Sequence, residues 1–284
     1  MYRTILLTGL AMTAFAANSL LARAALADGT SDPGSFTVIR LVSGAAVLAL
    51  LMIGQHGRAT LRRAAGSWPS AICLFAYALA FSLAYMRLGA ATGALILFAS
   101  VQGTMLLWSI ARRDRPTLAE TLGLAVAFGA LVYLLLPGLR APDLLGSLLM
   151  IGSGMAWGAY SLRGRGAVDP LQETAGNFIR AAVICLPLIG FTMLYGHITF
   201  YGTVLAVISG VIASGVGYAV WYRVLPQLSA SLAGTVQLTV PAIAALGAVL
   251  FLSEILTLRL IIASACILGG VAVATLWRNT AKAA

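Results

Sequence analysis

Residues 222–258 constrain the fold of this chain more than any other stretch. After Arg223, no charged side chain occurs until Glu254. An α-helix needs roughly 20 apolar residues to cross about 30 Å of hydrocarbon, and this run is long enough to do so. Pro241, near the middle of the run, would break a helix in water. A membrane helix tolerates it where a neighbouring helix or a cavity satisfies the freed carbonyl group, so the run predicts a transmembrane helix with a weak point at Pro241.

The rest of the chain has the same apolar character. Of its 284 residues, 61% are hydrophobic and 9% are charged, and the mean hydropathy is +0.97. A soluble domain of this size needs a more highly charged surface, so the chain is predicted to be an all-α polytopic membrane protein. The net charge of +10 is interpreted as an orientation signal in the membrane and not as a nucleic-acid-binding surface. The three cysteines lie in apolar runs away from any histidine, which indicates neither a disulfide nor a metal site.

Apolar runs divide the chain into ten predicted transmembrane helices, joined by short loops of which several contain Pro or Gly. The first run could also be read as a signal peptide. It is longer than a signal-peptide core and resembles an internal segment, so it is assigned as a helix. The third and fourth helices are separated only by residues 87–89, the least distinct boundary. The expected helices span residues 4–25, 35–54, 68–87, 90–111, 117–137, 143–162, 173–195, 201–222, 229–252 and 257–277.

Basic residues are distributed unevenly between the two sets of predicted loops. If both termini lie on one side of the membrane, twelve basic residues lie on that side and four on the other. Cytoplasmic loops carry the excess of Lys and Arg in membrane proteins, so both termini are predicted to be cytoplasmic. The larger set is Arg3, Arg58, Arg62, Arg63, Arg112, Arg113, Arg115, Arg163, Arg165, Arg223, Arg278 and Lys282, and the smaller set is Arg23, Arg87, Arg140 and Arg259.

The two halves of the chain resemble each other at a nearly constant offset. Each half holds five predicted helices. Because five is odd, the second copy is expected to lie inverted in the membrane, as in secondary transporters built from inverted repeats. The two units are predicted to span residues 1–138 and 139–284. The aligned segments are residues 15–20 with 157–162, Ile39-Arg40 with Ile179-Arg180, residues 114–118 with 254–258, and Gly129 with Gly269.

The chain resembles the drug/metabolite transporter superfamily, and its EamA-type exporters in particular. The resemblance rests on the ten helices in two inverted halves, the paired Ile-Arg positions, and the Leu-Ser-Ala-Ser, Val-Pro and Leu-Ser-Glu motifs within residues 228–254. It implies export of small metabolites across the bacterial inner membrane, and YddG-like members export aromatic and other neutral amino acids. It also implies a central cavity between the halves, with the fifth and tenth helices at the periphery. The first half has Val101-Gln102-Gly103 where the second has Pro241, so an asymmetric hinge is expected.

Polar and aromatic side chains deep in the predicted helices are the candidates for a substrate cavity. Phe15 and Asn18 share a helix face, as do their repeat partners Trp157 and Tyr160. Symmetry-related positions between the halves are where a transporter of this architecture binds substrate. The same side chains could instead pack the helices or join them by hydrogen bonds. The candidate cavity residues are Phe15, Asn18, Tyr77, Phe81, Gln102, Trp157, Tyr160, Tyr218, Trp221, Tyr222 and Gln237.

Charged residues within the predicted helices are few. Arg40 and Arg180 are interpreted as snorkelling or as pairing with polar neighbours such as Asn177; as substrate ligands they would favour a carboxylate. No acidic residue or histidine lies deep in a predicted helix, whereas proton-coupled exporters usually keep a carboxylate there. The chain is therefore expected to act without ion coupling and without a cofactor.

Together these features predict an exporter of small metabolites, with neutral or aromatic amino acids as the expected substrates. Its halves are expected to alternate access by rocking about Pro241, and the protein to be a monomer or homodimer in the lipid bilayer. A multidrug exporter remains an alternative, because an aromatic cavity suits amino acids, nucleosides and apolar drugs alike. A channel-like or scaffold membrane protein is a further alternative. No predicted helix contains a histidine, an aspartate pair or a Gly-x-Ser-x-Gly motif, so an enzyme is not expected.

Overall fold

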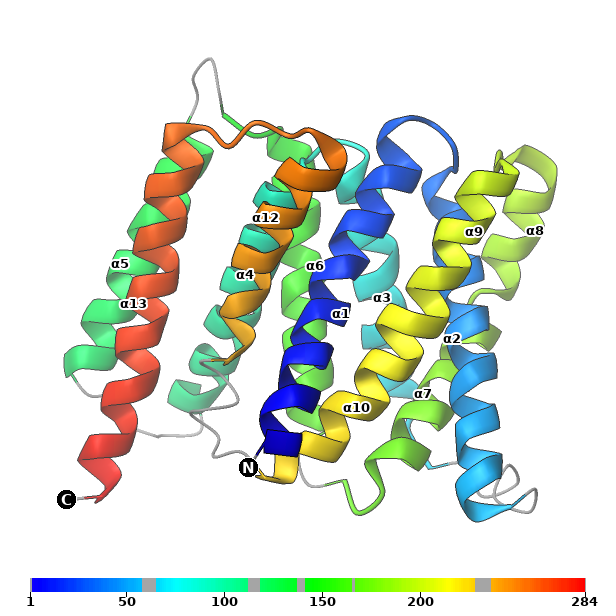
Figure 1. Cartoon of the computed structure of the whole chain (residues 1–284), viewed down its shortest axis with the longest axis horizontal. Coiled ribbons are helices and arrows are strands. Elements are labelled where there is room, and N and C mark those ends of the chain that lie inside the picture. The colour runs from blue at the N-terminus through cyan, green and yellow to red at the C-terminus, as the bar shows by residue number, and fades with distance from the viewer. Residues whose placement is uncertain are drawn as a thin grey trace.

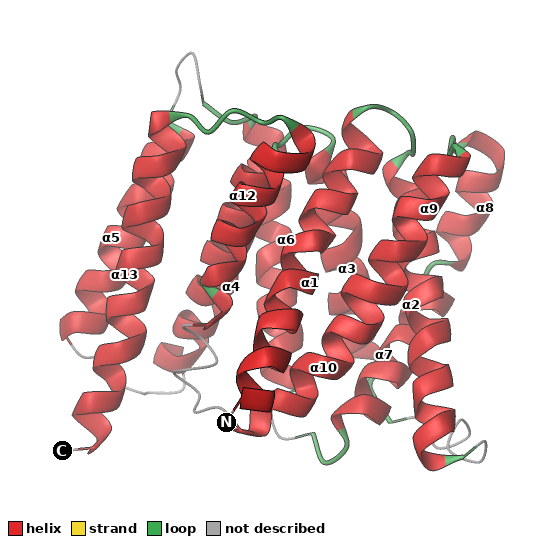
Figure 2. Cartoon of the chain, in the orientation of Figure 1, coloured by secondary structure: helices red, strands yellow, loops and turns green. Residues whose placement is uncertain are grey.

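The computed structural model describes residues 2–57, 65–111, 118–136, 141–164, 167–227 and 236–283. These residues are almost entirely helical, and short loops connect the helices (Figure 2). The elements are α1 (Tyr2–Ala27), α2 (Pro33–His56), α3 (Trp68–Tyr85), α4 (Ala90–Ala111), α5 (Leu118–Leu135), α6 (Leu144–Arg163), α7 (Pro170–Ile184), α8 (Leu186–Tyr195), α9 (Phe200–Ile208), the π-helix η2 (Ser209–Val216), α10 (Gly217–Val224), the 3-10 turn η3 (Leu225–Gln227), α12 (Thr239–Leu252) and α13 (Leu258–Ala283).

The all-α, multi-pass fold is confirmed. Four of the described helices are long and apolar enough to cross a bilayer, and the bent pair α7 and α8 is a fifth candidate. The indistinct boundary at residues 87–89 is a real interruption, since α3 ends at Tyr85 and α4 begins at Ala90. The unit boundary at 138–139, part of the ninth predicted helix, and many of the basic loop residues used for orientation lie outside the described residues. The two inverted units therefore stay a prediction.

The prediction of one continuous seventh helix over residues 173–195 was wrong. It is divided at Cys185 into α7 and α8, which are bent by 48° relative to each other. Pro187 lies in the first turn of α8. Proline has no N–H to donate to the preceding turn, and its ring clashes with the carbonyl four residues earlier, so the helix cannot continue straight through it.

The helices form a bundle in which α1 packs between the orange helix α12 on one side and the yellow helices α9 and α10 on the other (Figure 1). The helices α5 and α13 pack mainly against each other at one side of the molecule, so the peripheral position implied for the fifth and tenth helices is observed. The beginning of α1 and the end of α13 lie at the same end of the bundle (Figure 1).

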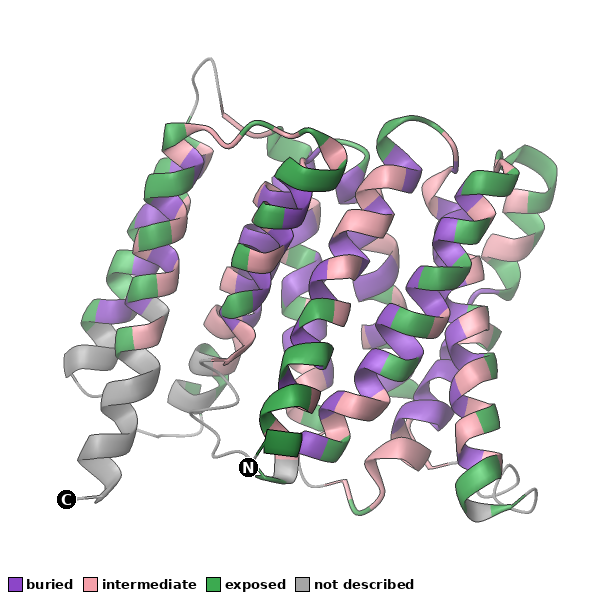
Figure 3. Ribbon diagram, viewed as in Figure 1, coloured by how far each residue is buried: buried purple, intermediate pink, exposed green. Residues whose placement is uncertain are grey.

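Buried residues cover the helix faces that point into the bundle, and exposed residues cover its outer faces (Figure 3). Many exposed side chains are large and apolar, for example Phe128 and Phe251, as expected where lipid surrounds the protein. Small residues allow close helix packing inside the bundle. A Cβ on Gly154 of α6 would lie 2.6 Å from the carbonyl oxygen of Leu97, so this glycine brings α6 against α4. This packing positions the central cavity.

Candidate functional site

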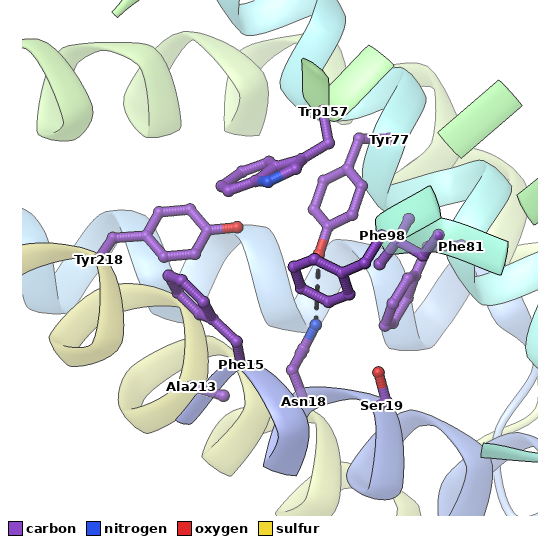
Figure 4. Close-up of a pocket in the computed structure, with 10 residues that line it drawn as sticks. Phe15, Asn18, Ser19, Tyr77, Phe81, Phe98, Trp157, Ala213 and Tyr218 are labelled. Atoms are coloured by element: carbon purple, nitrogen blue, oxygen red, sulfur yellow. Dashed lines mark hydrogen bonds between the residues drawn. The ribbon is translucent and has the colours of Figure 1, made fainter. Parts of the chain in front are cut away.

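A small cavity lies among α1, α3, α4, α6, η2 and α10 (Figure 4). Its volume is about 20 Å³, which is enough for about one water molecule and too small for a metabolite. The bundle is thus in a closed arrangement around this point. The lining residues are Phe15, Asn18, Ser19, Tyr77, Phe81, Leu97, Phe98, Trp157, Ala213 and Tyr218.

Aromatic rings from several helices form most of the cavity wall. Trp157 is at their centre, with its ring centroid 5.0 Å from that of Tyr77 and 4.9 Å from that of Tyr218. Phe15 packs edge-on against Tyr218 at 5.6 Å, and Tyr160 stacks on Trp157 at 5.3 Å. We call these five residues the aromatic cluster. Rings at such separations attract each other beyond simple burial and offer a broad apolar surface to a ligand.

A chain of hydrogen bonds crosses the other side of the cavity. The Tyr77 hydroxyl oxygen accepts from Asn18 Nδ2 at 3.3 Å, shown by the dashed line in Figure 4, and from Arg40 Nη2 at 2.8 Å. The Oδ1 atom of Asn18 accepts from Ser209 Oγ at 2.7 Å. These contacts join α1, α2, α3 and η2, so the polar side of the cavity is built from residues far apart in sequence.

Arg40 lies directly behind this polar side. Its side chain is 1% exposed, its Nε donates to Ser214 Oγ at 3.1 Å, and its guanidinium carbon lies 4.9 Å from the ring centroid of Phe81. The interpretation that Arg40 snorkels was wrong, because α3 and η2 pack over the side chain in the middle of the bundle. The alternative interpretation, pairing with polar neighbours, is correct for this residue.

Six of the predicted cavity residues line the cavity, namely Phe15, Asn18, Tyr77, Phe81, Trp157 and Tyr218. Two more support the wall from behind, since Tyr160 stacks on Trp157 and Trp221 packs edge-on against Phe15 at 6.1 Å. The structure does not bring the remaining three, Gln102, Tyr222 and Gln237, to the cavity wall.

Sequence reasoning missed four of the residues that line the cavity. Phe98 lies one turn before Gln102 on α4, and the helical period alone could have found it. Ala213 lies in a π-helix, whose side-chain register a 3.6-residue period does not predict. Ser19 and Leu97 are neighbours of Asn18 and Phe98, but no pattern in the sequence separates them from packing residues.

The weak point at Pro241 takes the form of a helix break. Residues 236–237 are helical, Leu238 is in a turn, and α12 begins at Thr239, which places Pro241 in the first turn of α12. Proline cannot donate to the carbonyl of Gln237, so an interruption just before it is expected. In contrast, α4 continues without a break from Ala90 to Ala111. Whether the break acts as a hinge stays a prediction.

Polar contacts tie the helices together at the end of the bundle that holds the α1–α2 loop. Glu254 Oε1 accepts from Arg23 Nε at 3.3 Å and from the backbone N–H of Ala90 at 2.9 Å. Arg23 also donates to the carbonyl oxygen of Tyr85 at 3.1 Å. These bonds connect α1, the α3–α4 turn and the α12–α13 loop.

Asp32 makes a second tie at the same end. One of its carboxylate oxygens accepts from the backbone N–H of Ser35, and the other accepts from that of His197, both at 2.9 Å. Burial alone would raise the pKa of Asp32, but hydrogen bonds from Ser35, His197 and Gly34 lower that pKa below its ordinary value. Asp32 is thus held as a carboxylate that joins the start of α2 to the α8–α9 loop.

At the opposite end, α6 and α7 are tied to the start of α3. Arg163 Nε donates to Ser70 Oγ at 3.0 Å, and Asn177 Oδ1 accepts from the backbone N–H of Ser67 at 2.9 Å. Arg180 Nη1 donates to the carbonyl oxygen of Ala65 at 2.8 Å. Both ends of the bundle are therefore held together around the small cavity. Within the described part of the chain, no group of His, Cys, Asp and Glu side chains could hold a metal ion.

Residues 144–276 match the EamA-like transporter family. The uncharacterized protein PA1977 of Pseudomonas aeruginosa is 51% identical over 95% of this chain and 93% of its own length. The uncharacterized transporter YwfM of Bacillus subtilis is 27% identical over 82% of this chain and 81% of its own. The crystal structure of a protein 22% identical in sequence superposes with a TM-score of 0.66 over 95% of this chain and 98% of that one, which shows a shared fold.

Proposed function

Because this chain belongs to the EamA-like transporter family within the drug/metabolite transporter superfamily, we propose that it exports neutral or aromatic amino acids. It is a multi-pass membrane protein, and we place it in the bacterial inner membrane with both termini in the cytoplasm. The observation that carries the proposal is the central cavity. It offers aromatic rings on one side and uncharged hydrogen-bonding groups such as Asn18 and Ser19 on the other. An amino acid presents matching apolar and polar parts.

Transport proceeds by alternating access in this proposal. The closed cavity of about 20 Å³ cannot hold an amino acid, so substrate requires a second arrangement in which one end is open. Opening one end breaks the bonds of Glu254 and Asp32, and opening the other breaks those of Arg163 and Asn177. These polar ties make each end a gate that can be released separately from the other.

We further propose that export is not coupled to ions. Within the described residues, the acidic residues are in loops or in first helical turns, and the better buried of the two ion pairs joins Glu254 to Arg23 at the bundle end. A carboxylate that exchanges a proton for substrate is usually placed deep in the membrane. In this protein, the residues that line the central cavity carry aromatic, apolar or neutral polar side chains.

The substrate class is tested by measuring efflux of labelled metabolites from cells that express the protein. The panel contains phenylalanine, tryptophan, leucine, a nucleoside and an apolar cationic drug. Faster efflux of the amino acids than from control cells supports the proposal, whereas efflux of the drug alone supports the multidrug alternative. Equal efflux with and without the protein for every compound contradicts export.

Coupling is tested with the purified protein in proteoliposomes. Flux of an exported amino acid is measured down its own gradient, with and without a pH gradient of either sign. The proposal expects equal initial rates, together with saturation and counterflow. A rate that rises with the pH gradient contradicts uncoupled transport, and a rate that never saturates supports a channel.

The hinge is tested by Pro241→Ala. Alanine restores the missing N–H and allows the break at Leu238 to close, so transport is expected to slow several-fold while the protein stays folded. The matched control is Pro187→Ala, which changes the exposed proline in the first turn of α8 and is expected to leave the rate unchanged. Wild-type flux in a well-expressed Pro241→Ala protein rules the hinge out.

A further inference from the structure

Arg40 is a permanent positive charge in the middle of the bundle. Its side chain is 1% exposed, so water does not solvate the charge. A buried lysine can relieve such a position by losing its proton, but a guanidinium keeps its charge at every physiological pH. The charge must therefore be balanced by neighbouring groups or by a ligand.

The neighbours of Arg40 do not supply a negative charge. Its two hydrogen bonds go to neutral hydroxyls, of Tyr77 and Ser214, and its ring contacts are with Tyr77 and Phe81. Within the described residues, the ion pairs join other arginines to carboxylates, and Arg40 Nη1 is buried without a hydrogen-bond partner. Ring faces and hydroxyls offset only part of the cost of a buried charge. A charged donor is thus left unused beside the cavity.

Tyr77 connects this charge to the cavity. Its hydroxyl oxygen already accepts two hydrogen bonds, from Arg40 and from Asn18, which uses both of its lone pairs. Its own O–H hydrogen is then available to donate, and Tyr77 lines the cavity. A ligand group that meets Tyr77 is favoured if it accepts hydrogen bonds and carries negative charge, because the guanidinium lies immediately behind the hydroxyl.

We propose that Arg40 and Tyr77 form a carboxylate-binding subsite of the central cavity, so that the transported molecules are carboxylic acids. The substrate carboxylate accepts from the Tyr77 hydroxyl and balances the charge of Arg40, while the apolar part of the substrate lies against the aromatic cluster. The inference rests on the proposed export function and narrows it: amino acids qualify through their carboxylate, and apolar cationic drugs are excluded. Arg40 is assigned to recognition of the substrate, and it is the counter-ion of a ligand.

The subsite is tested by binding to the purified, detergent-solubilised full chain. Three probes share a phenyl group and differ in charge: 3-phenylpropionate, its neutral amide 3-phenylpropanamide, and phenethylammonium. Thermal unfolding is followed as each probe is added to the wild type, Arg40→Gln and Arg180→Gln. We expect the carboxylate to stabilise the wild type at concentrations on the order of 10- to 100-fold lower than the amide, as for a charge-assisted hydrogen bond.

Arg40→Gln removes the charge and keeps a shorter polar side chain, so the preference for 3-phenylpropionate over its amide should disappear. Arg180→Gln removes a charge of the same kind from α7, away from the cavity, and should retain the preference. Equal or absent stabilisation of the wild type by acid and amide overturns the proposal, and so does a preference that survives in Arg40→Gln. If Arg40→Gln does not fold, Arg40→Lys keeps the charge without the planar guanidinium, and the subsite then requires the acid preference to weaken but persist.

The binding measurement and the efflux assay can each contradict one proposal without contradicting the other. Acid-selective binding without amino-acid efflux contradicts export and leaves the subsite standing. Efflux of labelled phenylalanine together with equal binding of acid and amide contradicts the subsite and leaves export standing.

Discussion

The helices α2 and α7 begin in the same way and carry the same pair of residues, yet their arginines have different surroundings. Each follows an Asp-Pro step whose aspartate caps the helix, and each contains Ile-Arg. Arg40 of α2 is fully buried and donates to side chains beside the central cavity. Arg180 of α7 is half-buried and donates to the backbone carbonyl groups of Ala65 and Gly176 at one end of the bundle.

The difference follows from what packs against each helix. Four residues before Arg180 is Gly176, where a Cβ would overlap with the carbonyl oxygen of Ala65, so this glycine lets the loop before α3 reach the arginine. Four residues before Arg40 is Phe36, a fully buried side chain that fills the same position. The same helix pattern therefore provides a structural tie at the bundle end in α7 and a buried charge behind the cavity in α2.

The largest loss of stability is expected from Gly210→Ala, which disturbs the surroundings of Arg40. A Cβ on Gly210 would overlap with the carbonyl oxygen of Arg40 and would push η2 away from α2. Two packed helices cannot yield easily, so we expect the free energy of unfolding to fall by about 3 kcal/mol, the cost of overpacking a core. The loss is measured by thermal or denaturant unfolding of the purified protein.

The matched variant in α7, near Arg180, is Gly176→Ala. Its Cβ would overlap with Ala65, but a loop moves at a lower cost than a helix, so a smaller loss of about 1 kcal/mol is expected. Gly190→Ala is the control, because open space surrounds Gly190 in α8. If Gly176→Ala destabilises the protein more than Gly210→Ala, the surroundings of Arg180 are the more rigid and the comparison is reversed.

A smaller effect is expected from removing single acceptors near the two arginines. Tyr77→Phe leaves Arg40 Nη2 and Asn18 Nδ2 without their acceptor in a buried place, and should cost about 2 kcal/mol of stability. Asn177→Ala removes the acceptor of the Ser67 N–H near the bundle end and should cost about 1 kcal/mol. Unfolding of both variants under the same conditions checks the order. Equal losses of stability would mean that removing an acceptor beside the cavity costs no more than removing one at the bundle end.

Local patterns in the sequence predicted most of the helices and much of the aromatic wall. In lipid, each backbone N–H and C=O group must be satisfied within the segment, so a long apolar run implies a helix, as the bounds of α4 and α6 illustrate. Trp157 and Phe15 were predicted together because they align between the two halves of the chain, and they line the same cavity.

The features that sequence did not predict depend on contacts between helices. Arg40 is buried by Tyr77 and Ser214, which are 37 and 174 residues away along the chain, and no local pattern reports such neighbours. Ala213 reaches the cavity through a π-helix, which shifts side chains relative to the ordinary helical period. Residues 173–195 were predicted as one helix, whereas the chain bends by 48° between α7 and α8, where Pro187 lies in the first turn of α8.

The smallest effect is expected at the beginning of α2, where Asp32 caps the helix that carries Arg40. Asp32→Ala removes the cap and the bond from His197, and should cost about 1 kcal/mol at neutral pH. Because the pKa of Asp32 is lower in the folded protein than in the unfolded chain, its contribution to stability is complete above the unfolded pKa. The contribution is lost as the pH falls through the folded pKa, below about pH 4.

The variant Asp32→Asn keeps a capping oxygen without the charge, so its stability should fall less than that of the wild type over this range. Asp28→Asn removes one charge from the same loop and controls for net charge. Identical acid profiles for the wild type and Asp32→Asn, recorded by unfolding between pH 3 and 6, would show that the Asp32 carboxylate does not hold α2 to the α8–α9 loop.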